Sequence, residues 1–114
     1  MNLTSDAAAR LDASFFALSD ATRRAILLRL AKGEATVNEL TQQFSISQPA
    51  ISRHLKVLEN AGLIRRGRNA QRRPAAIDPH SLQEINRWIE RYREIWETAY
   101  QRLDHALAEH MKGQ

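Results

Sequence analysis

Residues 47–58 read S-Q-P-A-I-S-R-H-L-K-V-L, and folded as a helix this stretch has two chemically different faces. At 100° per residue, Ile51, Leu55 and Leu58 fall within about 60° of one another and form an apolar side. Short or basic side chains occupy another side, namely Gln48, Pro49, Ser52, Arg53 and Lys56. Most of these can donate hydrogen bonds. The pattern therefore predicts a helix that packs on a core and presents its outer face to a polar, anionic partner.

The positive charge of the chain is concentrated in and just after this helix. The whole chain carries +4 at pH 7. Residues 53–73 contain seven lysines and arginines and a single acid, Glu59, so this segment carries +6 and the remaining residues together carry −2. A concentrated basic segment is typical of a nucleic-acid contact surface. The alternative is a basic loop that is merely solvated.

Length and composition indicate one globular domain over residues 1–114. Hydrophobic residues make up 43% and charged residues 26% of the chain, values that argue against disorder. The sequence has no run of 18 apolar residues and no signal-peptide pattern at its start. It has no cysteine, which excludes disulfides, a thiol nucleophile and cysteine-based metal or redox sensing. We therefore expect a cytoplasmic protein that uses no cofactor.

Two helices are expected at the start of the chain. The first covers residues 7–18, where one face carries Leu11, Phe15 and Leu18. Asp20 is a typical N-cap for a second helix at residues 21–32, which Gly33 ends. The buried stripe of this second helix consists of Ile26, Leu27 and Leu30.

A helix-turn-helix is expected over residues 36–60. Thr36 and Glu39 form a capping box, with a hydroxyl at the N-cap and a carboxylate three residues later. They open a short third helix, whose apolar positions are Val37, Leu40 and Phe44. After a tight turn, Ser47 caps the fourth helix, and Gly62 ends it. A short helix, a turn and a second helix with a polar outer face make a helix-turn-helix.

A basic β-hairpin is expected over residues 63–78. Leu63–Ile64 and Ala75–Ile77 are the candidate strands, joined by a loop around Gly67–Gln71. Pro74 cannot donate to a ladder, so its strand is predicted to lie at an edge. Such a ribbon after a helix-turn-helix is called a wing. The expected fold is therefore mostly α with a small β-hairpin wing, a winged helix-turn-helix.

Residues 81–111 are expected to form one long helix. Apolar residues recur at a 3-4-3-4 spacing for over three heptads, at Leu82, Ile85, Ile89, Tyr92, Trp96, Ala99, Leu103 and Ala106. This spacing is typical of a coiled-coil seam. Trp88 and Ile95 widen the apolar stripe, so one small domain cannot cover the helix fully. We expect a homodimer, with the first helix of each chain contributing, in preference to burial within one chain. The predicted interface residues are Leu11, Phe15, Leu82, Ile85, Ile89, Tyr92, Trp96 and Leu103.

The sequence resembles the ArsR family of winged helix-turn-helix transcriptional regulators from about Leu11 to Leu107. The resemblance rests on F-F-A-L-S-D-A-T-R-R-A-I-L-L-R-L, on S-Q-P-A-I-S-R-H-L-K-V-L-E-N-A-G-L-I and on the basic wing that follows. It implies a dimer formed by the first and last helices, with each fourth helix in a DNA major groove. It also implies repression of transcription that a ligand or a metal usually relieves.

The chain departs from the family where many members bind metals. Thr36 and Asn38 stand where the family's third-helix cysteines would be, so that thiolate site is absent. Other members bind zinc between their last helices. Here His105 and His110 are five residues apart, which points the two imidazoles about 140° from each other on a helix. We therefore expect solvated histidines and no metal site within one chain. An apolar effector near Trp88, Tyr92 and Trp96 is an alternative to simple core packing.

The helix-turn-helix interpretation assigns the DNA contacts. Gln48 can pair with adenine, Arg53 with guanine, and Ser52 with a base or a phosphate. His54 lies on the flank of the apolar stripe and is expected to be structural. Alternation along the first strand sends one of Arg65 and Arg66 toward DNA, and the sequence does not say which. The complete set of predicted DNA-contact residues is Ser47, Gln48, Pro49, Ser52, Arg53, Lys56, Arg68, Arg72 and Arg73.

Two other function classes are considered. An enzyme is not expected, because the four histidines lie in different predicted elements and no Gly-rich phosphate loop, paired catalytic carboxylates or serine elbow accompanies them. The second alternative is a protein-interaction module that dimerises through its long helix and has little or no specific DNA binding. The polar face of residues 47–58 and the basic segment after it disfavour that alternative.

Overall fold

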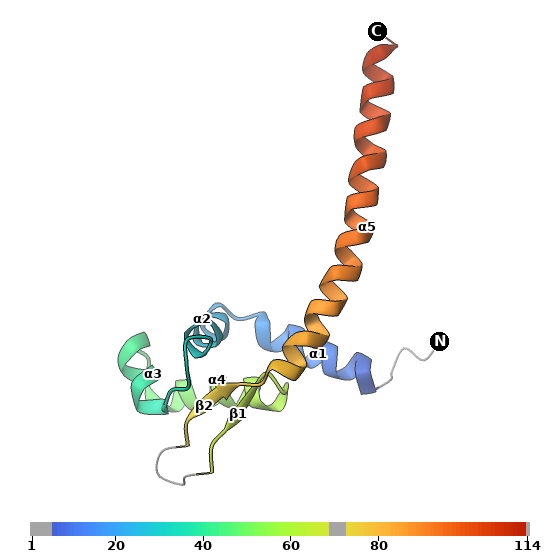
Figure 1. Cartoon of the computed structure of the whole chain (residues 1–114). Coiled ribbons are helices and arrows are strands. Elements are labelled where there is room, and N and C mark those ends of the chain that lie inside the picture. Colours follow the sequence, from blue (N-terminus) through green and yellow to red (C-terminus); the bar gives the residue numbers. More distant parts are fainter. Residues whose placement is uncertain (1–5, 69–72, 114) are drawn as a thin grey trace. The chain divides into compact units, whose positions relative to one another are not determined.

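The computed structural model describes residues 6–68 and 73–113. Within these ranges the element order is α1 (Asp6–Leu18), α2 (Ala21–Leu30), α3 (Val37–Phe44), α4 (Gln48–Asn60), β1 (Ile64–Arg66), β2 (Ala75–Ile77) and α5 (Pro79–Lys112) (Figure 1). The predicted fold class, mostly helical with a small antiparallel hairpin, is confirmed. The chain divides into two compact units, Met1–Gln83 and Glu84–Gln114.

Helix α4 lies at the centre of the first unit. It packs against α1, α2, α3 and β1. Its predicted apolar face is fully buried, since Ile51, Leu55 and Leu58 have no exposed surface. Ile26 from α2 and Leu40 from α3 are fully buried in the same unit. Burying a large aliphatic side chain stabilises a fold by about 1.5–3 kcal/mol, so this face holds α4 in place and leaves its polar side exposed.

The helix ends follow the sequence closely. Thr36 accepts from the backbone N–H of Glu39, and the Glu39 carboxylate accepts from that of Thr36, which completes the predicted capping box. Asp20 caps α2, and Ser47 caps α4 by accepting from Ala50. At the other end of α4, Gly62 has a φ of +77°, a left-handed conformation that glycine adopts without strain. These caps fix where the two helices of the helix-turn-helix begin and end.

Helix α1 turns small residues inward. Ser14 and Ala17 are its buried residues. Of its predicted apolar face, Leu11 and Leu18 are half-buried and Phe15 is 38% exposed. Small inward side chains let a helix approach its neighbours closely. The larger residues of α1 are therefore left toward the outside of the single chain.

The hairpin has the predicted position with shorter strands. Ile64 pairs with Ile77, Arg65 with Ala76 and Arg66 with Ala75. Leu63 lies just outside β1, where it is fully buried. Pro74 precedes β2, so its missing donor costs the ladder nothing. The edge expected beside Pro74 is partly covered, because Ala35 exchanges two backbone hydrogen bonds with Ala75, of 2.7 and 3.0 Å.

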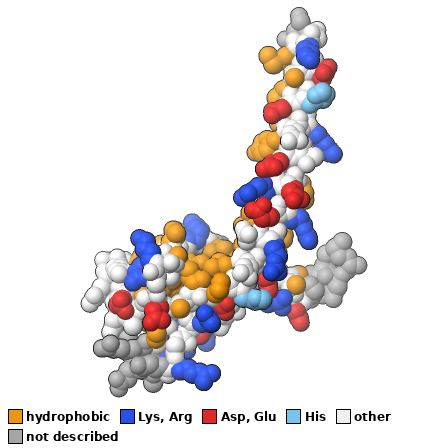
Figure 2. All heavy atoms as spheres, in the orientation of Figure 1, with side chains coloured by type: hydrophobic (Ala, Val, Ile, Leu, Met, Phe, Trp, Pro, Cys, Tyr) orange, Lys and Arg blue, Asp and Glu red, His pale blue; other side chains and the backbone are white. Residues whose placement is uncertain are grey.

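The second unit is formed by α5 from Glu84 onward. The helix has 34 residues, three more than the 31 expected over residues 81–111. From residue 86 to residue 113 every side chain is exposed, including large apolar ones. Figure 2 shows hydrophobic side chains recurring along this helix among charged ones. From residue 86 onward the apolar pattern of α5 is therefore not covered within a single chain.

Candidate nucleic-acid interface

The outer face of α4 is fully available for a partner. All six residues predicted here as DNA contacts are exposed: Ser47, Gln48, Pro49, Ser52, Arg53 and Lys56. From Gln48 to Lys56 they span about 140° of the helix circumference at 100° per residue. The neighbouring arc carries the buried residues Ile51, Leu55 and Leu58. The helix thus separates a packing face from a polar, basic face, as the sequence predicted.

The N-terminus of α4 adds an electrostatic contribution to this face. The first backbone N–H groups of a helix have no intrahelical acceptor and carry a partial positive charge. Ser47 satisfies the N–H of Ala50 at 3.3 Å. Pro49 lies in the first turn and lacks an N–H of its own. An exposed helix start beside Arg53 and Lys56 favours an anion such as a phosphate.

The hairpin adds further basic groups. Arg65, Arg68 and Arg73 are exposed, and Arg66 is half-buried. Arg72, which the sequence also assigns to DNA contact, lies outside the described residues. The two neighbouring arginines of β1 differ in their surroundings, because Arg65 is exposed whereas Arg66 is half-buried and bonded to a backbone carbonyl.

Arg66 and Arg73 join the two arms of the wing and connect it to α4. Arg66 donates from Nε and Nη2 to the carbonyl oxygen of Arg73, at 3.2 and 2.9 Å. Arg73 donates from Nε to the carbonyl oxygen of Gly67 at 3.3 Å. Its Nη2 also lies 3.7 Å from Oε2 of Glu59, in the last turn of α4. Burial lowers the pKa of Arg66, and the positive charge of Arg73 lowers it further.

Gly67 lets the two arms approach each other. A Cβ at this position would lie 2.7 Å from Cδ of Pro74, closer than side-chain atoms tolerate. Its backbone N–H donates to the carbonyl oxygen of Pro74 at 2.8 Å. The close approach sets the geometry of the wing immediately beyond the strands.

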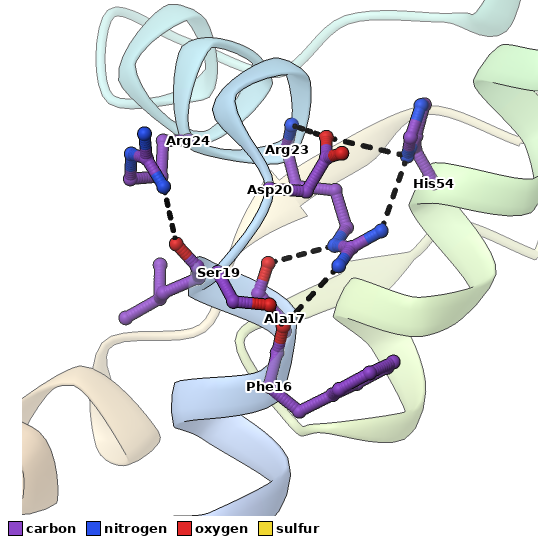
Figure 3. A network of polar contacts seen from close by, with 8 residues as sticks. Phe16, Ala17, Ser19, Asp20, Arg23, Arg24 and His54 are labelled. Atoms are coloured by element: carbon purple, nitrogen blue, oxygen red, sulfur yellow. Dashed lines mark hydrogen bonds and ion pairs between the residues drawn. The ribbon is translucent and has the colours of Figure 1, made fainter.

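A second network connects α4 to the end of α1 (Figure 3). Arg23, on α2, donates from Nε to the carbonyl oxygen of Ala17 at 2.7 Å and from Nη2 to that of Phe16 at 3.2 Å. Its Nη1 lies 3.4 Å from Nδ1 of His54, on α4. Oδ2 of Asp20 lies 3.9 Å from the same ring nitrogen. These contacts agree with the structural role expected for His54.

Sequence reasoning missed the partners in both networks. Glu59 is recognisable in the sequence as the one acid within a +6 segment, a signal that its charge is used locally. Arg23 gives no such signal, because the contact with His54 joins residues 31 positions apart. Its position in the segment F-F-A-L-S-D-A-T-R-R shows that it follows a helix end and nothing more.

The residues predicted for a dimer interface differ in exposure. Ile89, Tyr92, Trp96 and Leu103 are 41–54% exposed. Leu82 is half-buried, and Ile85 is only 5% exposed in the single chain. The place of Ile85 in a dimer interface stays a prediction, and its side chain is already mostly buried in the single chain.

Four aromatic rings follow one another along α5 at a spacing of four residues. Trp88 stacks on Tyr92 with ring centroids 5.0 Å apart. Tyr92 meets Trp96 edge-to-face at 5.7 Å, and Trp96 meets Tyr100 at 5.6 Å. Such pairs contribute about 0.5–1.5 kcal/mol beyond burial. The four rings line an exposed apolar face of α5, of which the sequence pattern had indicated all but Tyr100.

No three His, Cys, Asp or Glu side chains are grouped to hold a metal ion within residues 6–68 and 73–113. Among the same residues, no helix meets the length and hydropathy needed to span a bilayer.

Comparisons with known proteins agree with this geometry. The model of the family described as "Bacterial regulatory protein, arsR family" matches residues 20–66. The HTH-type transcriptional regulator Rv2034 of Mycobacterium tuberculosis is 41% identical over 81 residues, which cover 71% of this chain and 76% of that protein. The transcriptional repressor SdpR of Bacillus subtilis is 37% identical over 75 residues, covering 66% of this chain and 83% of that one.

Solved structures show the same fold. The crystal structure of the ArsR family transcriptional regulator RHA00566 superposes with a TM-score of 0.71 at 38% identity, and the match covers 77% of this chain and 97% of that chain. The homodimeric winged helix-turn-helix DNA-binding domain of Mb0332 from Mycobacterium bovis superposes with a TM-score of 0.61 at 22% identity, covering 83% and 94%. With its capped helix-turn-helix, basic wing and related sequences, this chain belongs to the ArsR family of bacterial regulatory proteins and is a transcriptional regulator.

Proposed function

We propose that the chain is a sequence-specific DNA-binding repressor that acts as a homodimer on a pseudo-palindromic operator. The observation that carries this proposal is the exposed polar face of α4, held on a fully buried apolar face and continued by the basic wing. A recognition helix needs this division, because its inner face fixes the orientation in which its outer face meets base edges.

The residues of this surface divide into two roles. Gln48, Ser52 and Arg53 lie in the first half of α4, the half that reaches base edges in a helix-turn-helix. Gln48 suits adenine and Arg53 suits guanine, each through two hydrogen bonds. Phosphate contacts are assigned to the remaining exposed groups, which are Ser47, Pro49, Lys56, Arg68 and Arg73. Arg72 is assigned the same role from the sequence alone.

Arg65 joins the phosphate contacts, and Arg66 does not. Arg65 is exposed on β1, whereas both hydrogen bonds of Arg66 are made to the carbonyl oxygen of Arg73. Half of the Arg73 side chain, 50%, stays accessible. It can therefore meet a phosphate while it holds the wing to α4.

Dimerisation is inferred from the uncovered apolar face of α5. Nine large apolar side chains between Trp88 and Met111 are at least 38% exposed. Monomeric proteins rarely expose large contiguous apolar patches, and the 3-4 spacing matches a second copy of the same helix. The Mycobacterium bovis relative of the same fold is a homodimer. Phe15, exposed on α1, is expected to join this interface.

Repression is the mode of action that the relatives favour, since the Bacillus subtilis relative SdpR is a transcriptional repressor. A dimer seated on its operator would exclude other proteins from the same stretch of DNA. A DNA-binding role places the protein in the bacterial cytoplasm, where the chromosome is. No enzymatic step is needed for this activity.

Selection from a pool of randomised duplexes tests the proposal. The purified chain should enrich a pseudo-palindrome whose half-sites are about 10–11 base pairs apart. The Arg53→Ala variant, carried through the same selection, should lose preference at one position in each half-site. A reporter with the enriched site beside its promoter should then be less active when the chain is present. Weak, steeply salt-dependent binding with no enriched sequence would contradict specific recognition and favour the interaction module.

A further inference from the structure

The network around Arg23 suggests a role that base contacts and phosphate contacts do not cover. Arg23 is on α2, yet its side chain reaches the end of α1 and the recognition helix α4 together (Figure 3). All these groups belong to the first unit of the chain. In the proposed dimer α1 contacts the partner and α4 contacts DNA, so one side chain lies between the two surfaces.

The contacts with α1 suit an arginine specifically. The last four carbonyl groups of a helix have no intrahelical donor and carry a partial negative charge. Arg23 donates to two of them, on Ala17 and Phe16, with separate nitrogens. The Phe16 carbonyl also accepts from the backbone N–H and the hydroxyl of Ser19. Its guanidinium carbon also lies 5.4 Å from the centre of the Phe16 ring, within the range of a cation–π contact. A planar group with several donors is needed to make these contacts together.

The contact with α4 is made through His54. Nη1 of Arg23 lies 3.4 Å from Nδ1 of the His54 ring. The His54 side chain is 22% exposed. Its neighbour in the chain, Arg53, is assigned to a base contact, and Leu55 is fully buried on the other side. A change at His54 therefore acts where the packing face and the reading face of α4 meet.

We propose that Arg23 is a positioning residue that sets the placement of the recognition helix relative to α1, and through it the half-site spacing that the dimer accepts. This inference rests on the proposed dimer and its DNA recognition. Loss of Arg23 leaves the reading residues of α4 unchanged but lets α4 shift relative to α1. The dimer then binds its best operator less tightly and discriminates less against operators with altered spacing.

Arg24 provides a matched control. It is the next residue of α2 and also donates to a carbonyl oxygen at the end of α1, from Nη1 to Leu18 at 2.8 Å. It is exposed, and this contact does not involve α4. Arg23→Gln and Arg24→Gln remove the same charge and a similar bond to α1. Arg23→Gln alone also removes the bond to Phe16, the contact with the Phe16 ring and the contact with His54, and the His54 variants isolate the last of these.

The experiment measures the affinity of the full chain for three duplexes: the selected operator, and versions with one base pair inserted or deleted between the half-sites. We expect Arg23→Gln to reduce the penalty for altered spacing about tenfold relative to wild type, while Arg24→Gln keeps the wild-type penalty. His54→Leu should behave like Arg23→Gln, and His54→Gln, which keeps an acceptor, should retain most of the penalty. In the Arg23→Gln, His54→Leu double variant, the spacing penalty should fall no further than in either single variant.

The experiment distinguishes a variant that does not fold, a wrong positioning role and a wrong proposed function. Circular dichroism at the binding temperature identifies any variant that is unfolded. If Arg23→Gln is unfolded, His54→Leu and His54→Gln still test the proposal, because neither substitution alters the contacts of Arg23 with α1. Equal spacing penalties for wild type, Arg23→Gln and His54→Leu would overturn the positioning role. The positioning role would also be overturned if the reductions in spacing penalty from the two single substitutions added up in the double variant. A wild-type chain that shows no preference among sequences or spacings would instead overturn the proposed function.

Discussion

Oε2 of Glu59 lies 3.7 Å from Nη2 of Arg73, which joins the last turn of α4 to the second arm of the wing. Glu59 is the one acid among residues 53–73. It therefore opposes the positive field of the proposed DNA surface while it holds one of the arginines of that surface. A pair this exposed contributes only about 0–1 kcal/mol to stability, so its main effect is expected in binding.

The first prediction concerns this pair. Glu59→Gln should raise the affinity for non-specific duplex DNA and steepen its dependence on salt by about one unit, because a negative charge is lost and Arg73 is released toward phosphates. The measurement is a fluorescence anisotropy titration at several salt concentrations. Glu97→Gln, on the exposed part of α5, makes the same change in net charge and serves as the control. Identical salt slopes for the two variants would show that the position of Glu59 has no importance.

The second prediction separates Arg65 from Arg66. Arg65→Gln should weaken binding to all sequences alike and lower the salt slope by about one unit, without changing thermal stability. Arg66→Gln should instead lower the free energy of unfolding by about 1 kcal/mol, because two hydrogen bonds to the carbonyl oxygen of Arg73 are lost. Thermal melts and binding titrations of both variants check this. A stability loss confined to Arg65→Gln would reverse the assignment.

The third prediction separates reading from anchoring along α4. Arg53→Ala should cost about 1–3 kcal/mol of specific binding and relax one base position. Lys56→Ala, one turn later on the same exposed face, should weaken binding to specific and random duplexes equally. The ratio of the two affinities is the quantity to compare. If both substitutions changed that ratio by the same factor, the division into readers and anchors would be wrong.

The elements around the site could be predicted from the sequence because their signals are local. The capping box of Thr36 and Glu39 and the caps at Asp20 and Ser47 involve residues three apart, and each is present as predicted. The apolar face of α4 follows from helical periodicity alone. The end of α4 at Gly62 follows from the left-handed conformation that glycine tolerates.

Contacts between distant segments could not be predicted in this way. The bridge between Ala35 and Ala75 and the contact between Arg23 and His54 depend on how the elements pack. The inward face of α1 was also not evident, because Ser14 and Ala17 are weaker hydrophobic signals than Leu11 and Phe15. Close packing between helices favours small residues on the inward face of α1, whereas a search for large hydrophobic residues passes over Ser14 and Ala17.

The fourth prediction concerns the pH dependence of stability. The hydrogen bond from the backbone N–H of Arg23 lowers the pKa of Asp20. Burial opposes this shift, and the charges of His54 and Arg23 add to it. A carboxyl whose pKa is lowered on folding stabilises the protein above its unfolded value, near 3.8, and this contribution is lost as the pH falls through the lowered value.

Asp20→Asn tests this, because asparagine caps a helix about as well but carries no charge. Urea unfolding between pH 7 and pH 2.5 should show wild type more stable than the variant at neutral pH, with the difference shrinking below about pH 4. A difference that stays constant down to pH 2.5 would mean that the charge of Asp20 does not stabilise the fold.

The central claim is that two recognition helices, fixed in one dimer, read two half-sites on the same side of a duplex. The most direct measurement compares the affinity for the selected operator with that for a version carrying about five extra base pairs between the half-sites, half a turn of the double helix. The second half-site then faces away from the dimer. We predict that the affinity for the half-turn operator falls to nearly that for random DNA. An insertion of a full turn, about ten base pairs, keeps both half-sites on one side of the duplex, so its loss of affinity depends only on whether the dimer can span the longer distance. Equal affinity for the original and the half-turn operator would mean that the chains bind independently, and it would contradict the claim.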